Sequence, residues 1–184
     1  MVLLHSPEKE IGFTSPDFAL KNIDNTIYTL DNFRNENGFL VMFICNHCPY
    51  VMAIIDRLIQ TCDALEKEGI KCVAIMSNDT EKYPDDSFEN MQKFSETRGF
   101  RFPYLIDEDQ STARAYGAVC TPDFFGFNAN GQLQYRGRLD SANNRPADKS
   151  TVPELFNAML EIKEKGQVTQ EQTPSMGCSI KWKT

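Results

Sequence analysis

Two cysteines, Cys45 and Cys48, are separated by two residues and stand between an apolar run and a long amphipathic pattern. The run 39–44 has the length and composition of a fully buried strand, and from Val51 onward apolar residues recur at helical spacing. The cysteines therefore lie at a helix N-terminus, where backbone N–H groups and the helix dipole favour a thiolate. Two intervening residues let the pair close a small disulfide ring. The pattern predicts a redox-active dithiol.

His47 lies between the two cysteines. A protonated imidazole beside a thiolate stabilises the reduced pair and makes the disulfide a stronger oxidant. The same residues also allow a pair of buried cysteines without redox chemistry, or a metal site. A metal site needs further ligands, but the other cysteines form no second pair of this spacing and the second histidine is the distant His5. We predict no metal and no cofactor.

Length and composition limit the class of protein. The chain has 184 residues, enough for one domain, which we expect to span 1–184 with a core at about 14–165 and a tail at 166–184. Hydrophobic residues make up 41% and charged residues 24%, as in ordinary globular proteins, and the net charge of −7 argues against nucleic acid and membrane surfaces as partners. The N-terminus lacks the basic region of a signal peptide, so we expect a cytoplasmic location.

Strands and helices alternate along the chain. Strand patterns at 18–20 and 27–30 flank a turn and predict an N-terminal β-hairpin, which follows a loose lead-in at 1–13. Further patterns indicate strands at 72–76 and 104–106, helices at 88–98 and 111–116, a hairpin at 123–136 and a last helix to about residue 165. This order predicts an α/β fold with a mixed central sheet and helices on both faces.

The chain resembles the thioredoxin-fold superfamily, and within it the peroxiredoxin-like AhpC/TSA-redoxin branch. The residues that carry the resemblance are the hairpin from Asp17 to Phe33, the motif Cys45-Asn46-His47-Cys48 and the pair Thr121-Pro122. The resemblance covers about residues 14–165 and implies a thioredoxin-like fold. It also implies that a cis-proline at Pro122 faces the cysteines, and that the backbone beside Thr121 holds the substrate strand.

The sequence departs from both patterns in this superfamily. Peroxiredoxins have a threonine three residues before their peroxidatic cysteine, where this chain has Cys45, and their arginine is replaced near Pro122. Thioredoxins have a tryptophan before the first cysteine and a buried carboxylate six residues before it, where this chain has Ile44 and Phe39. The usual proton-transfer group is therefore expected to be absent, with His47 as the nearby substitute.

Three hypotheses follow. The first is a thiol–disulfide oxidoreductase in which Cys45 attacks, Cys48 resolves the mixed disulfide and His47 tunes the thiol pKa. The second is a thiol peroxidase, an antioxidant role, in which Cys48 attacks peroxide and Cys45 or Cys178 resolves it. The third is a non-catalytic redox-sensing or binding module. Expected partners are protein or small-molecule thiols and disulfides, with peroxide under the second hypothesis, and the chain is expected to be a monomer or homodimer.

The remaining cysteines have separate explanations. Cys62 lies on the apolar stripe of the long helix and Cys72 in a buried strand, so both are predicted to be core residues. Cys120 directly precedes Thr121 and is a candidate resolving thiol. Cys178 lies after the last helix, where apolar and polar residues alternate, which indicates a docked extended segment. It is the second candidate for a resolving thiol.

Overall fold

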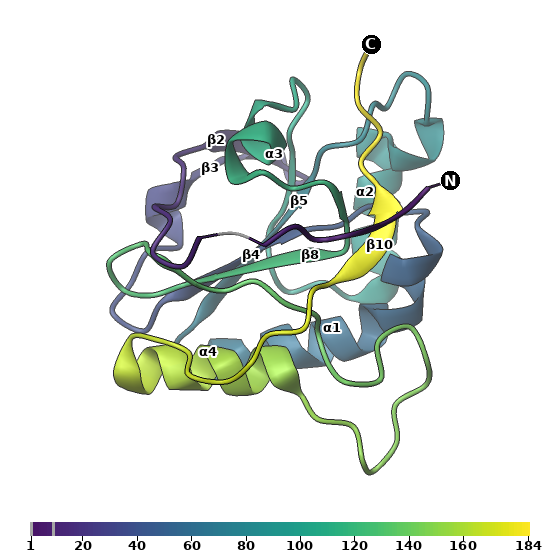
Figure 1. The fold of residues 1–184 in the computed structure, drawn as a ribbon. Helices are drawn as coiled ribbons and strands as arrows, with labels where there is room; N and C mark the ends of the chain where they lie inside the picture. The colour runs from purple at the N-terminus through teal and green to yellow at the C-terminus, as the bar shows by residue number, and fades with distance from the viewer. Residues whose placement is uncertain (1, 9) are drawn as a thin grey trace.

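A seven-stranded mixed sheet forms the centre of the computed structural model, which describes residues 2–8 and 10–184 (Figure 1). Along the sheet the strands follow the order β3-β2-β6-β5-β4-β8-β9. The three central strands β4, β5 and β6 are parallel, whereas β2 and β8 pair antiparallel with β6 and β4. The predicted mixed sheet and N-terminal hairpin are confirmed. The strands are β2 (Ala19–Asn22), β3 (Ile27–Thr29), β4 (Phe39–Phe43), β5 (Lys71–Met76), β6 (Tyr104–Ile106), β8 (Asp123–Phe127) and β9 (Leu133–Tyr135).

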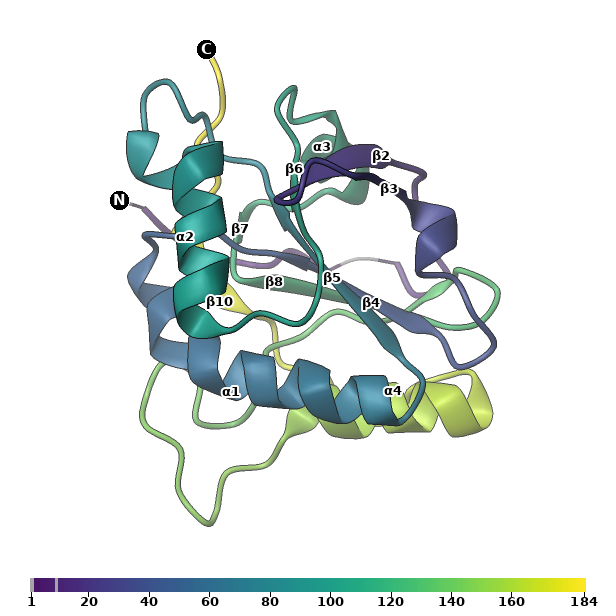
Figure 2. The ribbon, with the colours of Figure 1, turned by 180° about the vertical axis from the view of Figure 1, so that it is seen from behind.

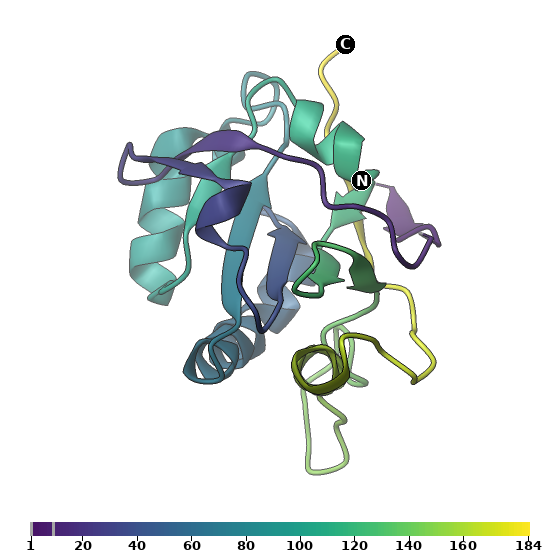
Figure 3. The ribbon, with the colours of Figure 1, turned by 90° about the vertical axis from the view of Figure 1, so that its left-hand side faces the viewer.

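Helices cover both faces of this sheet. Helices α1 and α4 lie side by side on one face, and α3 lies on the other (Figures 1 and 3). Helix α2 packs on the same face as α1 (Figure 2). No helix in the described part of the chain is long and apolar enough to cross a membrane. The helices are α1 (Pro49–Lys67), α2 (Phe88–Arg98), α3 (Ser111–Tyr116) and α4 (Glu154–Lys165), with the short 3-10 helices η1 (Leu30–Asn32) and η2 (Pro84–Asp86).

Strand β4 is buried on both faces, which explains its unbroken apolar sequence. Phe39, Val41 and Phe43 point into the core beneath α3. Leu40 and Met42 point into the core beneath α1. A strand fixed by packing on both sides gives a rigid carboxyl end, and the first cysteine of the motif lies just beyond it.

Helix α1 begins directly after the second cysteine. Cys48 is the N-cap residue, with an extended backbone (φ −70°, ψ 123°), and Pro49 occupies the first turn, where its missing N–H removes no hydrogen bond. The predicted apolar stripe is buried against the sheet. The side chains of this stripe are Val51, Ile54, Ile55, Leu58, Cys62 and Leu65.

A second, three-stranded sheet joins the two ends of the chain. It consists of β1 (Leu3–His5), β10 (Met176–Ser179) and β7 (Cys120–Thr121), with β10 in the middle and both pairings antiparallel. The docked tail segment is confirmed. The prediction of a loose lead-in at 1–13 is wrong, because β1 within this segment pairs with β10. The pairing depends mainly on backbone hydrogen bonds. Leu3 is 45% exposed, so the segment shows little of the burial pattern that marks a strand in the sequence.

Gly177 lets β10 approach β7 unusually closely. A Cβ atom at this position would overlap the carbonyl group of Thr121. Any other residue would therefore push the two strands apart. The close approach places Cys178, the next residue in β10, opposite Thr121 in the strand register.

Candidate active site

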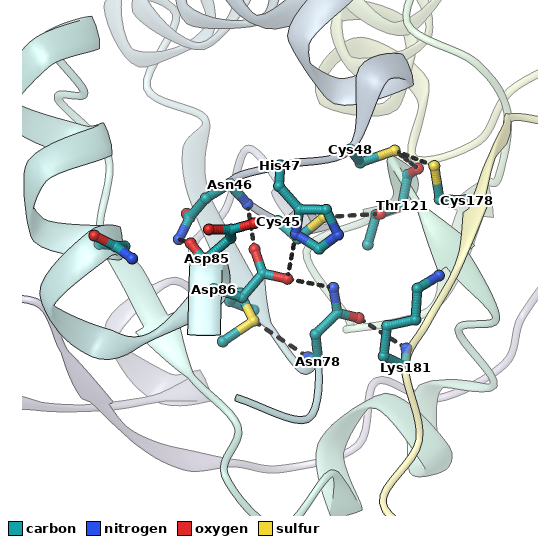
Figure 4. Close-up of polar contacts among 12 residues, drawn as sticks. Cys45, Asn46, His47, Cys48, Asn78, Asp85, Asp86, Thr121, Cys178 and Lys181 are labelled. Carbon is teal, nitrogen blue, oxygen red and sulfur yellow. Dashed lines mark hydrogen bonds and ion pairs between the residues drawn. The ribbon is translucent and has the colours of Figure 1, made fainter. Parts of the chain in front are cut away.

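The two motif cysteines, present as thiols, meet at Thr121 (Figure 4). Thr121 Oγ1 lies 3.3 Å from Cys45 Sγ, and the Thr121 carbonyl oxygen lies 3.2 Å from Cys48 Sγ. The peptide bond between Thr121 and Pro122 is cis. The structure thus brings the Thr121-Pro122 pair to Cys45 and Cys48. The two cysteines precede Thr121 by more than 70 positions in the sequence.

Cys48 is the more acidic of the two thiols. Hydrogen bonds from the thiols of Cys45 and Cys178, and from the backbone N–H of Val51, outweigh burial and lower the pKa of Cys48 to about 5. Its place at the N-terminus of α1 acts in the same direction, because the helix dipole favours negative charge there. These effects favour a thiolate at Cys48 at neutral pH.

Cys45 has the opposite tendency. The pKa of its thiol is raised well above the ordinary value, first because its proton is held by the Cys48 sulfur, then because of burial and the negative charge of Asp86. The hydroxyl of Thr121 acts weakly against these effects. The reduced pair thus shares one proton, which resides on Cys45.

A buried carboxylate, Asp86, lies under the motif (Figure 4). It is fully buried and accepts hydrogen bonds from the backbone N–H of Asn46 at 2.8 Å and from Asn78 Nδ2 at 2.7 Å. His47 Nδ1 lies 2.8 Å from Asp86 Oδ2. The position that carries the buried carboxylate of thioredoxins is Phe39 in β4, as the sequence shows, but here another segment supplies a buried carboxylate, at the end of η2.

His47 connects this buried carboxylate to the surface. Its side chain is 21% exposed, and its ring stacks parallel to Tyr83 at a centroid distance of 6.2 Å. Both residues line a pocket of about 260 Å³. The pocket therefore lies beside the motif, to which His47 belongs. The remaining residues that line it are Val2, Ser179 and Lys181.

Asp86 was missed because nothing in the spacing around the motif indicates it. The signal lies in the topology. Strands β4 and β5 are parallel neighbours, so the segments that follow them meet at one edge of the sheet. Polar residues after β5, such as Asn78 and Asp86, are therefore candidates for contact with the residues that follow β4.

Cys45, His47 and Asp86 also form a cluster of possible metal ligands, with one ligand atom from each lying within 4.8 Å of the others. Both oxygens of Asp86 already accept hydrogen bonds from Asn46 and Asn78. We interpret Asp86 as a hydrogen-bonded support of the motif, with His47 beside it at ion-pair distance.

The other four cysteines differ in their positions. Cys62 and Cys72 are core residues, as predicted. Cys120 Sγ lies 3.8 Å from both Ser6 Oγ and the Pro122 carbonyl oxygen, on the face of β7 opposite to the Thr121 side chain. Cys178 Sγ lies 2.8 Å from Cys48 Sγ. Of the two candidate resolving thiols, Cys178 is the one in contact with the motif.

Two solved structures match almost the entire chain. One is an uncharacterized conserved protein from Geobacillus kaustophilus, 42% identical, with a TM-score of 0.91 and coverage of 100% of this chain and 97% of that chain. The other is a hypothetical protein from Sinorhizobium meliloti 1021, 36% identical, with a TM-score of 0.89 and coverage of 97% and 98%.

More distant relatives have described activities. The thiol-disulfide oxidoreductase ResA of Geobacillus thermodenitrificans (strain NG80-2) is 26% identical over 126 residues, which cover 67% of each chain. The thioredoxin domain of a thiol-disulfide oxidoreductase from Bacteroides vulgatus is 16% identical, with a TM-score of 0.60 over 70% of this chain and 89% of that chain, and shows the shared thioredoxin-like fold. The model of the AhpC/TSA family matches residues 11–136, more than half of the sequence. The chain therefore belongs to the AhpC/TSA family and has a thioredoxin-like fold.

Proposed function

We propose that this protein is a thiol–disulfide oxidoreductase whose Cys45 and Cys48 alternate between a dithiol and a disulfide. The observation that carries the proposal is the geometry of the pair: the sulfurs of Cys45 and Cys48 both contact Thr121, and Cys48 is the N-cap residue of α1. The similarity to the thiol-disulfide oxidoreductase ResA supports the same class of reaction. The substrates are protein or small-molecule thiols and disulfides.

The asymmetry between the two thiols supports a different role for each. In the oxidising direction, a substrate thiolate attacks Cys45 Sγ, the Cys45–Cys48 bond breaks, and Cys48 leaves as a thiolate. A low pKa makes Cys48 the better leaving group. A second substrate thiol then attacks the mixed disulfide, which releases the oxidised substrate and returns Cys45 as a thiol. In the reducing direction the same steps run backwards, so Cys45 attacks and Cys48 resolves.

The proton of Cys45 needs an acceptor in the reducing direction, because its thiol is not ionised at neutral pH. A ring nitrogen of His47 and a carboxylate oxygen of Asp86 each lie within 4.8 Å of Cys45 Sγ, and within the same distance of each other. We assign them the transfer of this proton, with Asp86 holding the imidazole of His47 in position. This is general acid–base catalysis of thiol exchange.

The peroxidase hypothesis has less support in the site. A peroxidatic cysteine needs hydrogen-bond donors that polarise the peroxide. The hydroxyl of Thr121 contacts Cys45 instead of Cys48, and the Cys48 sulfur faces the sulfur of Cys178. A cytoplasmic location, a single domain and a monomeric or homodimeric state stay predictions.

Thiol exchange in cysteine variants tests the proposal. We expect Cys45→Ser and Cys48→Ser each to abolish oxidation of a dithiol peptide by the protein, because either change removes the Cys45–Cys48 disulfide. Cys62→Ala, which alters a buried cysteine of the same helix, should leave the rate near wild type. The readout is formation of the peptide disulfide followed by mass spectrometry.

Exposure to stoichiometric hydrogen peroxide separates the alternatives. Peptide oxidation that is retained in Cys45→Ser would contradict the oxidoreductase. Rapid peroxide oxidation of Cys48 in the same variant would instead favour a peroxidase. If the wild-type protein reacts with neither the dithiol peptide nor hydrogen peroxide, the hypothesis of a non-catalytic binding module would remain.

A further inference from the structure

The C-terminal strand β10 lies directly across the cysteine pair. Cys178 Sγ is 2.8 Å from Cys48 Sγ, about 0.8 Å longer than the ~2.05 Å of a disulfide bond. Cys45, Cys48 and Cys178 are 1%, 0% and 3% exposed. Strand β10 therefore covers the sulfur of Cys48 on the side of Cys178.

The position of Cys178 is fixed by the backbone on both sides of it. Gly177 approaches the Thr121 carbonyl so closely that a side chain would not fit between them. The backbone N–H of Ser179 donates to the carbonyl of Val2 at 3.0 Å, and that of Ile180 donates to the carbonyl of Val119 at 2.9 Å. The contact between the two sulfurs is thus built into the three-stranded sheet.

We propose that Cys178 is a third redox thiol and that β10 is an internal substrate of the dithiol. Starting from the Cys45–Cys48 disulfide, the sulfur of Cys178 attacks Cys48 Sγ. The Cys48–Cys178 bond forms, the Cys45–Cys48 bond breaks, and the proton of Cys178 passes to the departing Cys45 sulfur. One disulfide replaces another, so the exchange needs no external oxidant or reductant. This inference rests on the proposed function, because that function supplies the first disulfide.

The exchange moves the oxidising equivalent within the site. Before it, the disulfide includes Cys45, whose sulfur lies within 4.8 Å of a ring nitrogen of His47, a residue that lines the pocket. Afterwards the disulfide lies beneath β10 and ties the C-terminal strand to the start of α1. The Cys48–Cys178 form is therefore a second oxidised state, in which Cys45 is again a thiol.

A variant without Cys45 tests the inference separately from the proposed function. Oxidised glutathione should react with Cys48 in Cys45→Ser, and Cys178 should then displace the bound glutathione. The expected product is an intramolecular Cys48–Cys178 disulfide with two glutathiones released, identified by peptide mapping. The double variant Cys45→Ser/Cys178→Ala should lose this disulfide completely and retain glutathione on Cys48.

Cys45→Ser/Cys120→Ala is the matched control, because Cys120 is buried next to Thr121 but contacts Ser6 instead. It should form the Cys48–Cys178 disulfide as readily as Cys45→Ser does. Stable glutathionylation of Cys48 in a folded Cys45→Ser protein would overturn the inference, as would a disulfide to Cys120. Failure of the proposed function looks different: the wild-type protein would then form no disulfide at Cys45.

Discussion

Replacing Asp86 by asparagine should slow reduction of a disulfide substrate at pH 7 by about 100-fold, the lower end of the range for general acid–base catalysis. Asp86 is fully buried and lies 2.8 Å from His47 Nδ1, so it is the group that can hold the imidazole ready for the proton of Cys45. An asparagine keeps the size of the side chain but loses the charge. It also turns an amide N–H toward either Asn46 or Asn78, both of which donate to the native carboxylate.

The same variant should shift the ionisation of Cys45 in a direction that a purely structural defect would not produce. The negative charge of Asp86 raises the pKa of Cys45, so its removal should lower that pKa and move the midpoint of Cys45 alkylation to lower pH. Turnover would fall while the thiol becomes easier to ionise. Asp85→Asn, at the exposed neighbouring carboxylate, is the control and should change neither value. Unaltered alkylation in Asp86→Asn would contradict the proximity of the two groups.

The reduction potential of the pair should change slope near pH 5. Below this pH, reduction of the disulfide takes up two protons and the potential falls by about 59 mV per pH unit. Above it, Cys48 stays ionised while Cys45 is protonated, so reduction takes up one proton and the slope halves to about 30 mV. Thiolate stabilisation of the reduced form therefore starts at about pH 5 and increases with pH up to the ordinary thiol pKa of 9.0.

At pH 7, two units above the pKa of Cys48, ionisation favours the reduced form by a factor of about 100 in the equilibrium constant. The reduction potential should therefore be about 60 mV higher than that of a pair with ordinary thiols. Equilibration with glutathione buffers over a series of pH values measures it. Cys178→Ala removes one of the hydrogen bonds that lower the pKa of Cys48, and should move the change of slope to higher pH. Cys120→Ala should leave it in place. A slope that stays constant down to pH 4 would contradict an acidic Cys48.

The elements that hold the motif were predictable from the sequence because local patterns determine them. The apolar run of β4 and the stripe of α1 follow from burial on two faces and on one face. The Cys45–Cys48 spacing falls at their junction, so its position at a helix N-terminus needed no tertiary information. The hairpin that joins β8 and β9 has a strong local turn signal at 128–131.

The contacts that complete the site could not be predicted in this way. Asp86 reaches the motif through the pairing of β4 with β5, and Cys178 reaches Cys48 through a strand 130 positions away in the sequence. Strand β1 has an exposed leucine and is held largely by backbone bonds, which leave little trace in the pattern of side chains. Each of these contacts depends on which strands become neighbours in the sheets. The local patterns of a single sequence do not determine that arrangement.

Mapping the disulfides of the wild-type protein tests the central claim most directly. The reduced protein is treated with oxidised glutathione, quenched in acid at successive times, alkylated and digested. We predict that the first intramolecular disulfide joins Cys45 to Cys48, while the core thiols of Cys62 and Cys72 remain available for alkylation after unfolding. A folded protein in which Cys45 and Cys48 both stay alkylatable thiols, at a glutathione ratio that oxidises ordinary dithiols, would contradict a redox-active pair.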